Sequence, residues 1–321
     1  MPQPGVAAVH VNRPLTNISV AYIQTAMRSS MAAVAFPIVP VEKQSDRYFV
    51  YNKGDFLRDE AEIRAPGAES AGSGYALDST PNYFCPDYAL HKDVTDDEVA
   101  NSDDPLQPMD DAAEFIAQKL MIRREKLWAA NFFTTSKWAT DITPTTLWDA
   151  AGSTPLRDVA TGVDTILQST GMKPNTLILG RKVFTGLCEN TSIKEMIKYT
   201  QKGVVTEEIL AALLKVDRVL VGDMIENTAA QGQTASGAFI LGKHALLCYA
   251  APKPSLKQPS AGYTISWRGA GGPTGTRNAI GIATRRFRME HLKSERVESE
   301  FYFDMKLIAS DCGYFFPSAV S

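Results

Sequence analysis

The chain has 321 residues, of which 44% are hydrophobic and 21% are charged, and its formal net charge is −3. These values are typical of a folded protein with a sizeable core, and they exclude a disordered chain or a strongly basic surface for gripping nucleic acid. No run of 18 apolar residues predicts a membrane-spanning helix, and the four cysteines lie too far apart for a zinc knuckle or a redox motif.

The first 41 residues form a segment of low charge and little periodic pattern. They contain no Asp or Glu, and Arg13 and Arg28 are their only full charges. Such a segment cannot build a core of its own, so its apolar residues must dock elsewhere. These residues include Ile18, Val20, Tyr22, Phe36, Ile38 and Val39. The pattern predicts an extended N-terminal arm.

Residues 42–105 are strongly acidic, because 15 Asp and Glu face 6 Lys and Arg, which gives a net charge of −9. Strand-like residues flank a turn signal at Lys53, Gly54 and Asp55. A run of small residues and glycine at 65–74 suits a flexible tip or connector. We expect a projecting, hairpin-like flap in this segment.

A long helix is predicted from Asp111 to Thr134. Asp111 and Glu114 have the spacing of a capping box, and apolar residues then recur on one helical face. That face carries Ala113, Ile116, Leu120 and Leu127. The opposite face is expected to be solvated or to meet an acidic surface, and it carries Lys119, Arg123, Arg124 and Lys126.

Beyond Pro155, helices alternate with short apolar strands, which is typical of a mixed sheet flanked by helices. The expected helices are 156–169, 181–190 and 206–215, and the expected strands are 176–179, 218–221, two within 239–249, and 262–267. Residues 297–307 have the cleanest period-two pattern of the chain, with Val297, Phe301, Phe303, Met305 and Leu307 on one face and Glu298, Glu300, Asp304 and Lys306 on the other. This alternation predicts a half-buried strand.

A search for chemistry finds no motif with the required spacing. The glycine-rich loop Gly269–Arg277 lacks the lysine of a Walker loop, so a structural loop is favoured. The acidic run from Asp93 to Asp104 lacks the spacing of an EF-hand, which favours a solvated or inter-subunit charge patch. The four histidines show no ligand spacing, and no nucleophile elbow is present. We expect no catalytic, cofactor-binding or metal site.

Three stretches of the sequence resemble the major capsid proteins of tailed bacteriophages with the Hong Kong 97 fold. They are LTNISVAYIQ at 15–24, FPIVPVEKQSDRYFVYNKGDFLRDEA at 36–61 and RAPG at 64–67. The later part of the chain, which ends in DCGYFFPSAV at 311–320, matches the family by the order of its elements more than by motif. The resemblance implies an α+β fold with an N-terminal arm, an extended loop, a long spine helix, and peripheral and axial domains.

The division of the chain that this resemblance implies has six parts. They are the arm at 1–41, the extended loop or flap and connector at 42–106, the spine helix and the start of the peripheral domain at 107–155, the axial domain at 156–258, peripheral strands at 259–300, and a C-terminal strand returning to the axial domain at 301–321.

The family likeness implies a structural protein that performs no catalysis. Its hexamers and pentamers would tile an icosahedral head enclosing double-stranded DNA, which it would contact weakly and without specificity. Expected partners are other copies of itself, a separate scaffolding protein, a portal protein and a possible decoration or cement protein, with no membrane contact. The protein would be made and assembled in the cytoplasm of the bacterial host. Two alternatives stay open, namely another virion protein such as a tail-tube subunit, and a soluble α/β enzyme.

In this family the flap of one subunit lies over the peripheral domain of its neighbour. The acidic flap has a plausible partner in the arginine-rich segment that precedes the alternating strand. The expected inter-subunit contacts are Lys53, Asp55, Arg58, Asp59, Glu60 and Glu62 on the flap, with Arg285, Arg286 and Arg288 opposite. No motif supports a covalent crosslink at Lys53.

Overall fold

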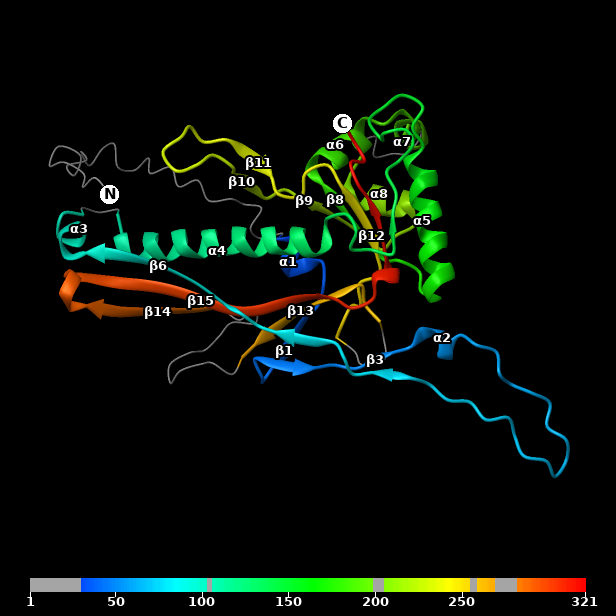
Figure 1. Ribbon diagram of the computed structural model, residues 1–321. Coiled ribbons are helices and arrows are strands. Elements are labelled where there is room, and N and C mark those ends of the chain that lie inside the picture. Colours follow the sequence, from blue (N-terminus) through cyan, green and yellow to red (C-terminus); the bar gives the residue numbers. More distant parts are fainter. Residues whose placement is uncertain (1–29, 103–105, 199–204, 255–258, 269–281) are drawn as a thin grey trace.

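The computed structural model describes residues 30–102, 106–198, 205–254, 259–268 and 282–321 (Figure 1). The glycine-rich loop, the arm residues Ile18, Val20 and Tyr22, and two carboxylates of the acidic run, Asp103 and Asp104, lie outside these ranges. Within them, no helix is both long enough and apolar enough to cross a membrane.

One sheet of five strands, which we call the long sheet, runs along the length of the molecule. Its strands are β1 (Ile38–Val41), β6 (Asp87–Thr95), β13 (Gly262–Trp267), β14 (Ile282–Met289) and β15 (Ser294–Leu307). β15 pairs antiparallel with β6, β13 and β14, and β1 runs parallel to β13. The predicted alternation in β15 is confirmed by four buried apolar residues, Val297, Phe301, Phe303 and Met305. Glu300 departs from it, because this residue is buried and pairs with Arg285 of β14.

The helix α4 (Pro108–Phe132) lies along β6 and β15 and covers one face of the long sheet (Figure 1). It begins three residues before the predicted start, because Pro108 suits the first turn of a helix, and it ends two residues before Thr134. Its buried side chains recur every fourth residue from Ala112 and include Ile116, Leu120, Arg124, Trp128 and Phe132. The prediction that Arg124 lies on a solvated face is therefore wrong.

A second, compact sheet has the strand order β7 (Thr140–Asp141), β16 (Gly313–Phe316), β12 (Ala245–Cys248), β8 (Thr176–Gly180) and β9 (Arg218–Gly222). Every residue of β8 and β12 is buried, which explains their continuous apolar sequences. The helices of this unit are α5 (Pro155–Thr170), α6 (Arg181–Glu189), α7 (Thr191–Ile197) and α8 (Glu207–Leu214). The predicted helices and the predicted strands at 176–179 and 218–221 are confirmed, and α7 was not predicted. Of the two strands expected within 239–249 only β12 lies there, because residues 240–243 form a turn.

The flap leaves the body as a long hairpin (Figure 1). It contains two strand pairs, β2 (Ser45–Arg47) with β5 (Asn82–Phe84), and β3 (Val50–Tyr51) with β4 (Leu77–Asp78). The predicted turn at Lys53, Gly54 and Asp55 is wrong, because these residues form the short helix α2 (Lys53–Phe56), which Asn52 caps by accepting a hydrogen bond from Gly54 N. The chain continues well beyond this point before it reverses.

The remaining elements are α1 (Met31–Val34), α3 (Asp96–Ala100), the hairpin of β10 (Ile225–Asn227) and β11 (Gly237–Phe239), and the 3-10 turns η3 (Glu290–Leu292) and η4 (Ser310–Cys312). One hydrophobic cluster joins the two sheets, since it contains Phe301 of β15, Phe315 of β16 and Trp128 of α4. Within residues 301–321, residues 301–307 belong to the long sheet as part of β15, and β16 is the strand that belongs to the compact sheet. The division expected at residue 301 therefore falls inside β15.

Candidate assembly surfaces

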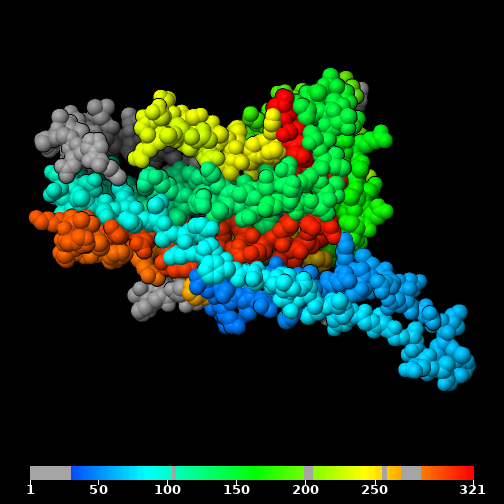
Figure 2. Space-filling view, viewed as in Figure 1, coloured from blue at the N-terminus to red at the C-terminus, as the bar shows by residue number. Residues whose placement is uncertain are grey.

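The flap exposes an aromatic cluster to solvent. The rings of Tyr51, Phe56 and Tyr75 contact one another, and their centroids lie 5.7–5.8 Å apart. Their exposed fractions are 44%, 63% and 65%. Figure 2 shows the flap extending away from the body, so little of the same chain covers it. A concentrated apolar surface of this kind marks a protein interaction site.

The structure gives the predicted flap residues different surroundings. Lys53 Nζ donates to Asp311 of η4 and to the carbonyl of Ser169, 3.3 Å away at the end of α5, so this side chain ties the flap to its own subunit. Asp55 accepts a hydrogen bond from Ala76 N at 2.8 Å, and Arg58 pairs with Glu60 at 3.2 Å.

Asp59 and Glu62 lie between these tethered positions. Both are exposed, and neither forms an ion pair with another described residue. Of the four carboxylates predicted as flap contacts, these are the two that the subunit itself does not use.

The three predicted arginines lie together on β14, and carboxylates of their own chain meet them. Arg285 pairs with Glu300 at 2.8 Å, Arg286 with Asp110 at 3.6 Å, and Arg288 forms a two-point contact with Asp96. The structure thus brings the arginines together but does not bring them to the flap of the same subunit. Their contact with a neighbour's flap stays a prediction.

A two-point ion pair also joins β6 to β15. Arg296 Nε and Nη2 donate to the two carboxylate oxygens of Asp93 at 2.6 and 2.8 Å. These hydrogen bonds lower the pKa of Asp93 below its ordinary value of 3.8. The acidic run therefore supplies ion-pair partners within the subunit. Among the described residues, no group of three or more Asp, Glu, His or Cys side chains could hold a metal ion.

We expect this pair to make stability depend on pH. Because the pKa of Asp93 is lowered in the folded state, its stabilisation is present above pH 3.8 and is lost as the pH falls through the lower folded value. The urea midpoint of the parent should exceed that of D93N at neutral pH, and the difference should shrink in acid. A difference that stays constant down to pH 2.5 would contradict the assignment.

The helical turn α1 is anchored by two buried charged side chains of α4, Arg124, which had been expected on a solvated face, and Glu125, which had not been predicted to act here. Glu125 of α4 accepts hydrogen bonds from Ser30 Oγ at 2.6 Å, Met31 N at 3.0 Å and Ala32 N at 3.1 Å. Arg124 Nη2 donates to the carbonyl of Ala32 at 2.9 Å. Burial lowers the pKa of Arg124 to about 10 and raises the pKa of Glu125, and each side chain is only 1% exposed.

A third charged side chain holds the other end of α1. Arg218 of β9 donates to the carbonyls of Val34 at 3.3 Å and Ala35 at 3.0 Å, and its Nε donates to Thr176 Oγ1 at 2.9 Å. Arg124, Glu125 and Arg218 together form what we call the α1 clamp. Local pattern could not reveal it, because the α1 groups lie 92–95 residues from Arg124 and Glu125 and 183–184 residues from Arg218.

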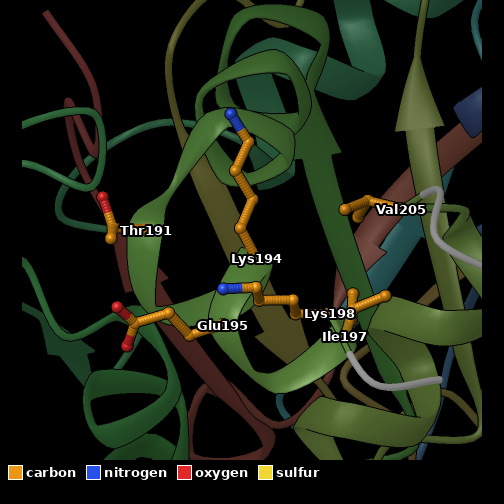
Figure 3. Close-up of a pocket in the computed structure, with 6 residues that line it drawn as sticks. All are labelled: Thr191, Lys194, Glu195, Ile197, Lys198 and Val205. Atoms are coloured by element: carbon orange, nitrogen blue, oxygen red, sulfur yellow. The ribbon is translucent and has the colours of Figure 1, made fainter.

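The chemistry of the described residues gives no sign of an active site. Burial raises the pKa of the Cys85 and Cys312 thiols to about 11 and that of Cys248 to about 12, so none is a reactive thiolate at neutral pH. One pocket of about 430 Å³ opens beside α7 (Figure 3). It is lined by Thr191, Lys194, Glu195, Ile197, Lys198 and Val205, a set without a nucleophile and base pair.

Known proteins resemble this chain in sequence and in structure. No protein-family model matches the chain. In sequence it is 27% identical over 316 residues to the major capsid protein of Burkholderia phage BcepMu, and the matched region covers 95% of each chain.

In structure it is similar to a phage-related protein from Bordetella bronchiseptica RB50, with a TM-score of 0.68, 22% identity, and coverage of 96% of this chain and 97% of the other. It is also similar to the capsid of cyanophage P-SCSP1u, with a TM-score of 0.56, 9% identity, and coverage of 88% and 85%.

Proposed function

We infer that this chain, a phage major capsid protein with the Hong Kong 97 fold, assembles as hexamers and pentamers into an icosahedral head that encloses double-stranded DNA. The observation that carries the assembly is the flap, which holds an exposed aromatic cluster far from its own core. A lone subunit leaves this surface in water, whereas a ring of subunits can cover it.

We propose that the flap is the extended loop of the family and that the long sheet with α4 is the peripheral domain. The compact sheet and its helices would be the axial domain. In this arrangement the flap of one subunit lies over the long sheet of the next. The arginines of β14 would then meet the acidic flap while keeping some of their contacts within the subunit.

Charge reversal at Asp59 and Glu62 tests this contact, because neither residue is tethered within its own subunit. One exposed pair is worth about 0.2–1 kcal/mol, so each single variant should assemble. In the double variant D59K/E62K both charge pairs are lost, and this loss occurs at every such subunit contact of the shell. We expect it to assemble poorly at low salt and better at high salt, as measured by sedimentation.

The control for this experiment is D164K/E208K, which changes the net charge equally on exposed positions of α5 and α8. Normal shells from D59K/E62K at low salt would show that apolar docking alone sets the register of the subunits.

The role of the protein in the virion is structural, and we propose that it has no catalytic turnover. We further propose that it is made and assembled in the cytoplasm of the bacterial host, and that its partners are a separate scaffolding protein, a portal protein and a decoration or cement protein. Contact with packaged DNA would be weak, since the formal net charge is −3.

Electron microscopy of the purified protein tests the proposal. Closed shells, or rings of five and six subunits, are the expected result. Long tubes would favour a tail-tube subunit instead. A folded monomer that stays monomeric at high concentration by light scattering would contradict assembly altogether.

A further inference from the structure

We propose that the α1 clamp fixes the angle between the long sheet and the compact sheet, and that this angle sets the curvature of the shell. The inference rests on the proposed function, because it concerns the geometry of the assembled particle. Arg124, Glu125 and Arg218 would then be positioning residues for assembly.

α1 depends on the clamp for its own structure. A helix of four residues is not stable alone, since its terminal N–H and C=O groups have no partners within the helix. Glu125 accepts from N–H groups at the N-terminal end, and Arg218 donates to carbonyls at the C-terminal end. Each charge also has the sign that the helix dipole favours at its end.

The two ends of α1 are held by different units of the molecule. Arg124 and Glu125 belong to α4, which packs on the long sheet, whereas Arg218 belongs to β9 at the edge of the compact sheet. The hydroxyl of Thr176 on the neighbouring strand β8 orients the guanidinium of Arg218. α1 is therefore a polar strut between the two units.

Much of the remaining contact between the units is apolar. Phe36, Trp128, Phe301 and Phe315 belong to one cluster that spans both sheets. Apolar contacts are not directional, so such a cluster stabilises the joint without selecting one angle. Hydrogen bonds weaken steeply when they are bent, and the planar guanidinium fixes two donors at once. The clamp thus adds directional contacts to the joint.

An error in this angle is repeated in every subunit of a shell. A closed particle needs each copy to present its contacts at a set inclination, so subunits with a loose joint should close irregularly or remain open. This consequence separates the role of the clamp in geometry from a role in stability alone.

The experiment compares R218M with R181M by cryo-electron microscopy of assembled particles. Arg181 pairs with Asp223 at 3.3 Å within the compact unit, so its loss removes an arginine contact without touching α1. We expect R181M to match the parent. R218M should keep the circular dichroism of a folded subunit, while its fraction of closed, uniform shells falls several-fold and its particle diameters spread.

Two milder variants keep the test decisive if R218M does not fold. R218K retains the charge but not the two-pronged donor, and T176V removes the hydroxyl that orients Arg218. Both should broaden the distribution of diameters as R218M does, but to a smaller extent. Uniform parental diameters in every folded variant would overturn the proposal, as would equal damage in R181M. A parent chain that forms no shells would instead contradict the proposed function.

Discussion

Replacing Glu125 by alanine should lower the free energy of unfolding of the subunit by about 3–5 kcal/mol, the range for breaking a buried charged network by removing one member. The substitution leaves Ser30 Oγ, Met31 N and Ala32 N without their acceptor. It also leaves the buried guanidinium of Arg124 without the adjacent negative charge. Urea unfolding of dissociated subunits, followed by tryptophan fluorescence, measures the change.

Two further variants separate the contributions to this effect. E125Q keeps one carbonyl oxygen as an acceptor but turns an amide N–H towards other donors, so its loss should be smaller than that of E125A. E114A changes an exposed glutamate of the same helix, and we expect it to lie within about 0.5 kcal/mol of the parent. An E125A subunit as stable as E114A would show that α1 is held by its apolar contacts alone.

Replacing Tyr51, Phe56 and Tyr75 together by serine should abolish shell formation and leave the subunit folded. In the free subunit these rings are largely exposed, so their loss removes little from the core. In a shell, burying on the order of 100 Å² of each ring against a neighbour is worth about 2.5 kcal/mol per ring. Sedimentation gives the assembled fraction, and circular dichroism monitors the fold.

The matched control is Y51F/Y75F, which keeps all three rings and removes only two hydroxyl groups. We expect this variant to form shells as the parent does. Shells from the triple serine variant would show that the aromatic cluster is not an assembly contact. Unfolding of the free subunit would show that the cluster serves the fold instead.

Local pattern predicted those elements whose burial follows from a simple period. The predicted helices and strands from Pro155 to Val221 have clear apolar periods, so these elements were predicted nearly to the residue. β15 alternates between a buried and a half-buried face apart from Glu300, and it was predicted from Val297 although it begins at Ser294. The short helix α7 was missed because it follows α6 directly, and its start depends on a single cap in which Asn190 accepts from Ser192 N.

The errors lie where distant partners decide the outcome. Arg124 and Glu125 have the composition of a solvated helix face, yet they are buried because Ser30, Met31 and Ala32 supply hydrogen-bonding groups from the distant N-terminal part of the chain. The sequence around Lys53 reads as a turn, but Asn52 caps a helical turn there. The aromatic cluster was not predicted either, although Tyr51 and Phe56 belong to the segment that was recognised as a flap.

The position of β15 and β16 in the chain bears on when a newly made subunit becomes able to assemble. β15 pairs with three strands of the long sheet, and β16 lies between β7 and β12 in the compact sheet. Both strands follow every other strand of their sheets in the order of synthesis. A nascent chain therefore cannot complete either sheet until residues 294–316 have emerged from the ribosome. Under the proposed function, subunits still in translation would lack both finished sheets, and this would delay their entry into a growing particle.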